Sequence, residues 1–82
     1  MDALKELRTK IDSIDDKVFI LLNERFTITS EVGKYKKDNS KVVLNLDREN
    51  EILDRISSFE FDSEIKKLYK KLFEISKDQQ RK

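Results

Sequence analysis

The side chains best suited to chemistry in this sequence are cations that lie along an otherwise apolar stripe. Arg8 and Lys36 fall in a seven-residue row beside that stripe and lean toward the interior. A buried arginine is costly unless an anion pairs with it. Because arginine binds carboxylates in a bidentate manner, cations along one buried seam predict a receptor for a small polyanion. A third cation, Arg25, holds a heptad position whose other members are apolar, namely Leu4, Ile11, Val18 and Val32.

Spacing decides which of these cations can bind the same ligand. Arg25 and Lys36 are eleven residues apart, roughly 16 Å along a helix, so their long side chains could hold one small molecule between them. Arg8 lies seventeen residues before Arg25, roughly 25 Å away, and would have to come from a second copy of the chain. The alternative is that the three cations extend to water or pair with Asp15 or Glu49.

Two further sets of polar residues are candidates for a site. Arg48 and Glu49 fall in the first turn of the second expected helix. Ser76 and Gln80 are four residues apart, so they share one face of the third. Each set also has a purely structural interpretation, the first as a solvated ion pair and the second as a fraying helix end. The spacing alone leaves both interpretations open.

The elements that position these residues begin with a long helix. A spacing of three and four residues between apolar side chains runs from Leu4 to Tyr35, interrupted at Arg25. This pattern predicts an amphipathic helix of about 35 residues, roughly 50 Å long, with Asp2 as its N-cap. A compact globule of this length has a radius of gyration of about 12 Å. The helix therefore overhangs any core that one chain can build, and we expect oligomerisation to cover its apolar side.

Polar and turn-forming residues mark the end of the long helix and the start of the next. We expect a loop at residues 37–41, with Asn39 in the left-handed conformation. Residues 42–44 form a short apolar tether. The second helix is expected to start at Asn45 or Asp47, both of which are favourable N-cap residues.

The last third of the chain contains one more connection and one more helix. Residues 57–61 form the connection, and Asp62 is expected to cap a third helix that frays over residues 79–82. The sequence therefore predicts an all-α fold of three helices, long, short and medium in that order. At this length, residues 1–82 are expected to form a single domain.

Composition excludes several classes of protein. The chain has 82 residues, 18 Lys and Arg against 17 Asp and Glu, one Gly, and no Pro, Cys or His. The missing Cys and His exclude disulfides, thiolate or imidazole metal sites, and catalysis by these side chains. Interleaved charges that sum to +1 argue against nucleic-acid binding. Because the sequence has no apolar run of membrane-spanning length and no signal peptide near Met1, we expect a cytoplasmic protein.

The ordered set of these residues resembles the all-helical class of chorismate mutases. The resemblance runs from about Leu4 to Gln80 without a gap. Each motif by itself is weak evidence for the family, whereas the complete set in this order is specific for it. It is carried by Leu7-Arg8-x-x-Ile11-Asp12-x-Ile14-Asp15, Leu21-Leu22-x-x-Arg25, Val32-Gly33-x-x-Lys36, Asp47-Arg48-Glu49, Ile52-Leu53 and Phe73-x-Ile75-Ser76-x-x-x-Gln80.

The resemblance implies a monofunctional, stand-alone chorismate mutase that forms an intertwined homodimer with two equivalent active sites. Each site would convert chorismate to prephenate by a Claisen rearrangement, in the shikimate pathway to aromatic amino acids. No cofactor, metal or covalent intermediate would be needed. Arg25 and the partner subunit's Arg8 would bind the two substrate carboxylates. Lys36 would reach a carboxylate and the ether oxygen, and Gln80 would be the second donor to that oxygen.

The same resemblance implies roles for residues of the second and third helices. Glu49 would accept a hydrogen bond from the ring hydroxyl, Arg48 would support the site, and Ser76 would contact a carboxylate. Asn45, also expected at the substrate, stands where relatives often have Asp. Val42 replaces a frequent proline, so we expect a more mobile tether.

Two other functions fit parts of the pattern. A lyase of the same fold that eliminates pyruvate from isochorismate would use a similar cationic pocket, so the pocket charges do not separate it from a mutase. A helical interaction module would use the long helix only to dimerise, and replacing Arg25 by leucine would then be neutral or stabilising.

Overall fold

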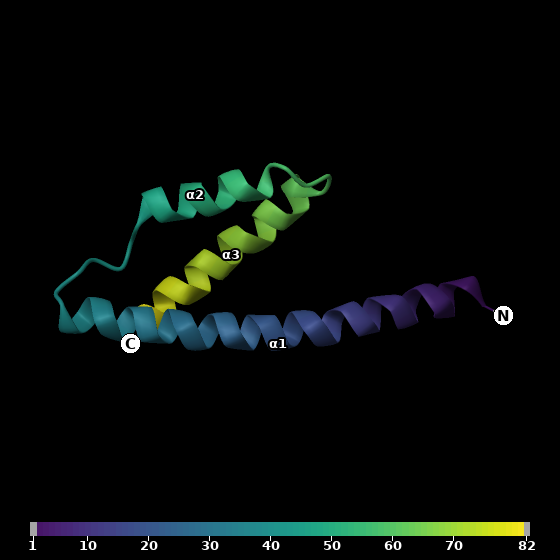
Figure 1. Cartoon of the computed structure of the whole chain (residues 1–82), viewed down its shortest axis with the longest axis horizontal. Coiled ribbons are helices and arrows are strands. Elements are labelled where there is room, and N and C mark those ends of the chain that lie inside the picture. The colour runs from purple at the N-terminus through teal and green to yellow at the C-terminus, as the bar shows by residue number, and fades with distance from the viewer. Residues whose placement is uncertain (1, 82) are drawn as a thin grey trace.

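The computed structural model describes residues 2–81 as three helices joined by two short connections (Figure 1). The long helix α1 spans Ala3–Asp38, the short helix α2 spans Leu46–Ile56, and the medium helix α3 spans Asp62–Gln80. These residues contain no strand, so the predicted all-α class is confirmed, with the three helices in the predicted order of length. Within the described part of the chain, no helix is long and apolar enough to cross a membrane.

Helix α1 runs unbroken over 36 residues because the chain has no Pro and the single Gly33 lies near the end of the helix. Asp2 is its N-cap, as predicted, and the Asp2 side chain accepts a hydrogen bond from Leu4 N–H at 3.0 Å. This helix determines the shape of the molecule, which measures 58 × 24 × 15 Å. The radius of gyration of 16.1 Å exceeds the value of about 12 Å for a compact globule of this length.

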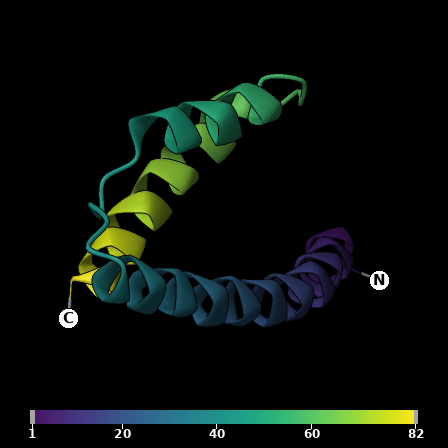
Figure 2. The same ribbon diagram turned by 60° about the vertical axis from the view of Figure 1, so that its left-hand side comes forward.

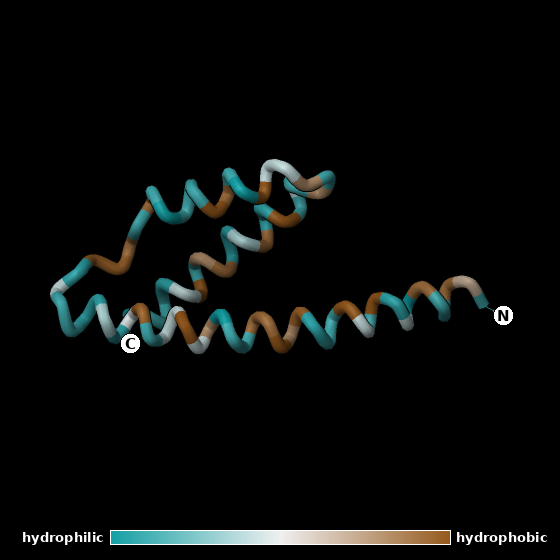
Figure 3. The backbone as a smooth tube through the Cα atoms, in the orientation of Figure 1, coloured by the Kyte–Doolittle hydropathy of each residue, from teal (hydrophilic) through white to brown (hydrophobic). Residues whose placement is uncertain are grey.

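Hydrophobic residues recur along the N-terminal half of α1, as the brown segments of the tube in Figure 3 show. They form an apolar stripe that stays exposed within the chain. This half of the helix extends away from the α2–α3 pair in both ribbon views (Figures 1 and 2). The side chains of the stripe are between 37% and 61% exposed. A contiguous apolar surface of this kind marks a site of interaction. We call it the α1 stripe, and its members are Leu4, Leu7, Ile11, Ile14, Val18 and Leu21.

Helix α3 is the element that joins the other two. It packs along α2, and its C-terminal part lies across the C-terminal half of α1 (Figure 2). The buried core of the chain is small, so most of the apolar surface of α1 remains uncovered. The core cluster consists of Ile52, Ile56 and Phe73, with Leu53, Ile65 and Tyr69 packed against it.

The end of α1 differs from the prediction by one residue. Asn39 is the C-cap with φ −111°, so it is not left-handed, and Ser40 adopts the positive φ of 54° instead. The backbone N–H groups of Ser40 and Lys41 bond back to the carbonyls of Lys37 and Lys36, at 3.4 and 2.7 Å. This is the Schellman arrangement, in which the left-handed residue is the one that follows the C-cap.

The predicted N-caps of the two shorter helices have different outcomes. Asn45, one of the two expected starting residues of α2, is its N-cap, and its side chain accepts from Arg48 N–H at 3.0 Å. The prediction that Asp62 caps α3 is wrong, because Phe61 is the N-cap and makes no side-chain hydrogen bond there. Asp62 is the first helical residue, and its carboxylate accepts from the neighbouring Ser63 N–H at 2.9 Å.

The predicted fraying over residues 79–82 is wrong for Gln79 and Gln80, because α3 continues through Gln80 and Arg81 is its C-cap. Lys82 lies outside the described residues. The helix persists because its last turn packs against α1 at Gly33. A Cβ atom added at Gly33 would lie 2.8 Å from Gln80 Cγ and 2.9 Å from Gln80 Cα, so only glycine allows this approach.

We expect Gly33→Ala to lower the free energy of unfolding by about 1–3 kcal/mol, the usual cost of overpacking. This loss should occur although alanine is favoured over glycine inside a helix by about 1 kcal/mol. The reason is that the added methyl group would overlap backbone atoms of Gln80. Urea unfolding followed by circular dichroism, at one protein concentration, measures the change.

The control is Ser30→Ala, at an exposed position of α1 one turn earlier. Because the Ser30 side chain is exposed, this variant gains helix propensity without overpacking, and its stability should stay equal or rise by a few tenths of a kcal/mol. A Gly33→Ala protein as stable as the Ser30→Ala protein would contradict the close packing of α1 and α3.

Candidate functional site

A cavity of about 270 Å³ lies among all three helices, where α3 crosses α1. Apolar side chains, including Val32, Ile52 and Phe73, form part of its lining. Polar groups come from every helix and from the tether, so the fold gathers residues that are far apart in the sequence. We call it the site cavity. Seven of the eight site residues predicted from the sequence line it: Arg25, Lys36, Asn45, Arg48, Glu49, Ser76 and Gln80.

Arg8 is the one predicted site residue that the fold of a single chain does not bring to the cavity. It lies exposed on the N-terminal half of α1, beside the α1 stripe. Seventeen residues of unbroken helix separate it from Arg25, which corresponds to roughly 25 Å. Its contribution to this site from a second chain remains a prediction.

Arg25 is held at the cavity wall by two neighbours on α3. Its Nη1 donates to Ser76 Oγ at 3.3 Å, and its guanidinium carbon lies 5.3 Å from the centroid of the Tyr69 ring. A cation over an aromatic face is attracted by the ring quadrupole. Arg25 is only partly exposed, and within residues 2–81 no carboxylate lies within ion-pair distance of it. The alternative in which Arg25 pairs with Asp15 or Glu49 is therefore not what the structure shows.

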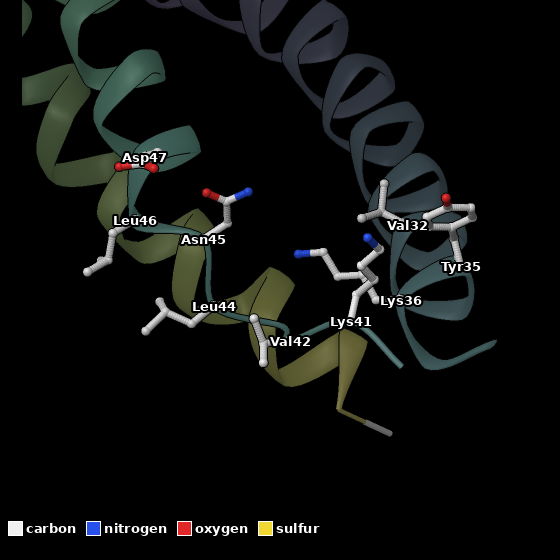
Figure 4. A pocket seen from close by; sticks show the side chains of 9 residues that line it. All are labelled: Val32, Tyr35, Lys36, Lys41, Val42, Leu44, Asn45, Leu46 and Asp47. Carbon is white, nitrogen blue, oxygen red and sulfur yellow. The ribbon is translucent and has the colours of Figure 1, made fainter. Parts of the chain in front are cut away.

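Lys36 connects α1 to the tether. Its Nζ donates to the carbonyl oxygen of Val43 at 2.8 Å, which uses one of the three donors of the ammonium. Lys36 also lines a second, more open hollow of about 660 Å³ between the end of α1 and the start of α2. Figure 4 shows this hollow, with Lys36 and Asn45 on opposite sides of it. The two hollows share Val32, Lys36 and Asn45 in their linings, so they adjoin each other.

Ser76 and Gln80 bring the last turns of α3 to the cavity. Ser76 is buried, with 5% of its surface exposed, and its hydroxyl accepts from Arg25. The Gln80 Oε1 atom is buried and has no hydrogen-bond partner among residues 2–81. An unsatisfied buried polar atom is rare in native proteins and calls for an explanation such as a ligand. Rotation of the terminal amide would present either its oxygen or its nitrogen to a bound molecule.

Gln79 was missed by the sequence analysis, although it fixes the end of α3. Its Oε1 accepts from Thr29 Oγ1 at 2.7 Å, and its Nε2 donates to the carbonyl oxygen of Phe26 at 2.9 Å. Both partners lie on α1, so this side chain sets how α3 sits on the long helix. The one signal in the sequence was Thr29, a polar residue in the same row as Arg8 and Lys36.

The charged residues of α2 do not pair as the sequence suggested. Arg48 pairs with Glu51 at 2.7 Å on the exposed surface, and its guanidinium is engaged there. Glu49 pairs instead with Lys77 of α3 at 3.3 Å. The interpretation of Arg48 and Glu49 as a solvated pair with each other is therefore wrong. Lys77 was also missed, although it lies four residues after Phe73 on the α3 face that turns toward the cavity.

The charges at the site cavity are strongly unbalanced. Among the described lining residues the only carboxylate is Glu49, which leaves a surplus of three positive charges, or two when Arg48 is counted with its partner Glu51. Such a surplus in a concave site with apolar walls suits a small molecule that carries two negative charges. Within residues 2–81 there is no group of three or more His, Cys, Asp or Glu residues that could hold a metal ion. The four cations are Arg25, Lys36, Arg48 and Lys77.

Comparison with known proteins defines the class to which this fold and site belong. The model of the chorismate mutase type II family matches residues 7–81. The chain therefore belongs to the chorismate mutase type II family, which confirms the resemblance found in the sequence.

Particular relatives agree with this assignment. The chain is 36% identical over 56 residues to a chorismate mutase of Methanocaldococcus jannaschii, covering 68% of this chain and 57% of that protein. It is 39% identical over 56 residues, or 68% of the chain, to the bifunctional chorismate mutase/prephenate dehydratase of Aquifex aeolicus. The chain spans only 16% of the length of that bifunctional protein.

A solved structure extends the similarity over the whole chain. A conserved hypothetical protein from Pyrococcus furiosus superimposes with a TM-score of 0.83 and 35% sequence identity. The superposition covers 98% of this chain and 97% of that one. The arrangement of long, short and medium helices is therefore shared along the full length of both proteins.

We expect Gln79→Met to lower the free energy of unfolding by roughly 1–3 kcal/mol, because two hydrogen bonds to α1 are lost. Thr29→Val should remove one of the same bonds, so the double variant should be less destabilised than the sum of the two single variants. Urea unfolding of the four proteins measures this coupling. If the losses of unfolding free energy in the two single variants add up to the loss in the double variant, the Thr29–Gln79 contact contributes nothing to stability.

Proposed function

We propose that this chain is a chorismate mutase, which catalyses the Claisen rearrangement of chorismate to prephenate on the route to aromatic amino acids. The observation that carries the proposal is the surplus of positive charge in the site cavity, which amounts to two charges when Arg48 is counted with its partner Glu51. Arg25 lies at the wall of this cavity, free of any carboxylate partner among residues 2–81. Chorismate offers two carboxylates to such a cavity. The similarity to a relative named chorismate mutase, in Methanocaldococcus jannaschii, supports the same activity.

The chemical requirements of this rearrangement match the groups that line the site cavity. One ether C–O bond breaks and one C–C bond forms within a single molecule, without a nucleophile, a base or net proton transfer. The protein then accelerates the reaction by holding the flexible dianion in its reactive conformer. Arg25, fixed by Ser76 and Tyr69, would bind one carboxylate, and the contact from Ser76 would help to orient it.

Negative charge grows on the ether oxygen as its bond to carbon breaks, and preorganised donors stabilise that charge. Lys36 keeps two of its three donors after its bond to Val43. The Gln80 Oε1 atom has no partner among residues 2–81, so the amide can rotate and turn its Nε2 donors to the position that the oxygen now holds. We assign these two side chains to the ether oxygen. Loss of one donor of this kind typically raises the barrier by about 3–4 kcal/mol.

The residues of α2 would bind the opposite end of the substrate. Glu49 would accept a hydrogen bond from the ring hydroxyl. Arg48 would support the site only after leaving Glu51, with which it pairs on the surface. Asn45 holds the first turn of α2 in place as its N-cap, so we assign it a positioning role beside the substrate.

The proposal includes an intertwined homodimer, with residues 1–82 as the folding unit. The exposed α1 stripe needs a cover, and antiparallel pairing of two long helices would bury the stripe of each chain. The same pairing would carry the partner subunit's Arg8 toward the site cavity, where it would bind the second carboxylate. Dimerisation would therefore complete both the core and the site.

We expect the unmodified protein to sediment with twice the mass of one chain, and Ile11→Glu to abolish the dimer because it buries a charge in the α1 stripe. Thr9→Glu introduces the same side chain on the opposite side of the helix and should stay dimeric. Analytical ultracentrifugation measures all three proteins. A monomeric unmodified protein, or a dimeric Ile11→Glu protein, would argue against this interface.

We expect the purified protein to form prephenate from chorismate and to leave isochorismate unchanged. Arg25→Leu should lose at least about 100-fold in kcat/KM, while its stability stays equal or rises because the apolar row is completed. Full activity of Arg25→Leu, or no prephenate from the unmodified protein, would contradict the proposal. Release of pyruvate from isochorismate would favour the lyase alternative.

A further inference from the structure

The ion pair of Glu49 with Lys77 differs from the other ion pairs of the described chain. It alone joins two different helices, α2 and α3, whereas the others connect residues three or four apart on one helix. Its two side chains are 21% and 23% exposed, the least of any pair. A partly desolvated pair interacts more strongly than an exposed one.

Lys77 belongs to the side of α3 that faces the site cavity. Phe73, Ser76 and Gln80 line the cavity from the same helix, at the spacing of one helical face. Glu49 reaches the cavity from the first turn of α2. The pair therefore closes the wall where α2 and α3 meet, and its charges are next to any molecule bound inside.

The other cations of the cavity are engaged elsewhere. Arg48 pairs with Glu51, Lys36 donates to Val43, and Arg25 donates to Ser76. Among residues 2–81, Lys77 is thus the cation that contacts the Glu49 carboxylate. Without it, the carboxylate would repel a dianionic substrate across a partly desolvated cavity.

We propose that Lys77 is a positioning residue for the rearrangement and acts through Glu49. Its ammonium group holds Oε2 of the carboxylate at 3.3 Å and leaves Oε1 to accept from the substrate hydroxyl. It also cancels the negative charge that the substrate would otherwise meet. This inference rests on the proposed chorismate mutase activity.

A double-mutant cycle separates action through Glu49 from direct contact with the substrate or from a role in folding alone. The variants are Lys77→Met, Glu49→Gln and the double variant, assayed for prephenate formation from chorismate. Lys77→Met should lower kcat/KM roughly tenfold when Glu49 is present. In the Glu49→Gln background the same change should cost less than about twofold, because a neutral amide needs no counter-charge.

Lys71→Met is the matched control, since Lys71 lies on the exposed side of α3 and pairs with Glu74. It removes one charge away from the cavity and should leave kcat/KM within about twofold of the unmodified protein. Lys77→Arg should restore most of the activity, because it keeps the charge beside Glu49. If Lys77→Met fails to fold, Lys77→Gln takes its place in the cycle.

Equal losses from Lys77→Met in both backgrounds would overturn the proposal, because Lys77 would then act independently of Glu49. No loss in either background would overturn it as well. If the unmodified protein forms no prephenate, the proposed function itself fails. If it is active while the cycle shows no coupling, only the role of Lys77 fails.

Discussion

The rest of the structure depends on the close contact between α3 and α1 at Gly33. Because this position has no Cβ, the backbone of Gln80 can approach the long helix, and α3 crosses α1 near its C-terminal end. The side chain of Gln79 fixes the same crossing through two hydrogen bonds to α1. The crossing places Ser76 against Arg25 and gives the site cavity its walls. A helix-interior glycine that costs about 1 kcal/mol in propensity is retained here for that geometry.

The second constraint is the length of α1. At 36 residues the helix extends far beyond the small core that α2 and α3 build (Figure 1). This length leaves the α1 stripe exposed and places Arg8 far from Arg25. Under the proposed function, the pairing of two chains would both bury the stripe and bring Arg8 of one chain to Arg25 of the other. Folding and assembly of a complete site would then be inseparable, as they are in obligate dimers.

Features that depend on local sequence could be predicted. The strict spacing of apolar residues gave the long helix and its cap Asp2, and the favourable cap Asn45 marked the start of α2. Arg25 was found because a charge on an apolar stripe needs an anion. Local rules were less accurate at the helix ends, where Ser40 rather than Asn39 takes the left-handed conformation.

Features that depend on how two helices meet could not be predicted. The ion pair of Lys77 with Glu49 joins residues of α3 and α2, and no spacing rule connects them. The same holds for Gln79, whose partners are on α1. Lys77 was passed over and Gln79 was expected in a fraying helix end, because polar residues near a helix end are usually exposed. Their contacts follow from the crossing at Gly33, which only the folded structure shows.

The central claim is that each site takes Arg25 from one chain and Arg8 from the other. The most direct measurement uses Arg8→Ala and Arg25→Ala homodimers, each expected to be nearly inactive in prephenate formation. Unfolded together and refolded, half of the dimers should be mixed, and one of the two sites in each should hold both arginines. The predicted result is recovery of about a quarter of the unmodified activity. No recovery, with mixed dimers shown to be present, would contradict a site shared between chains.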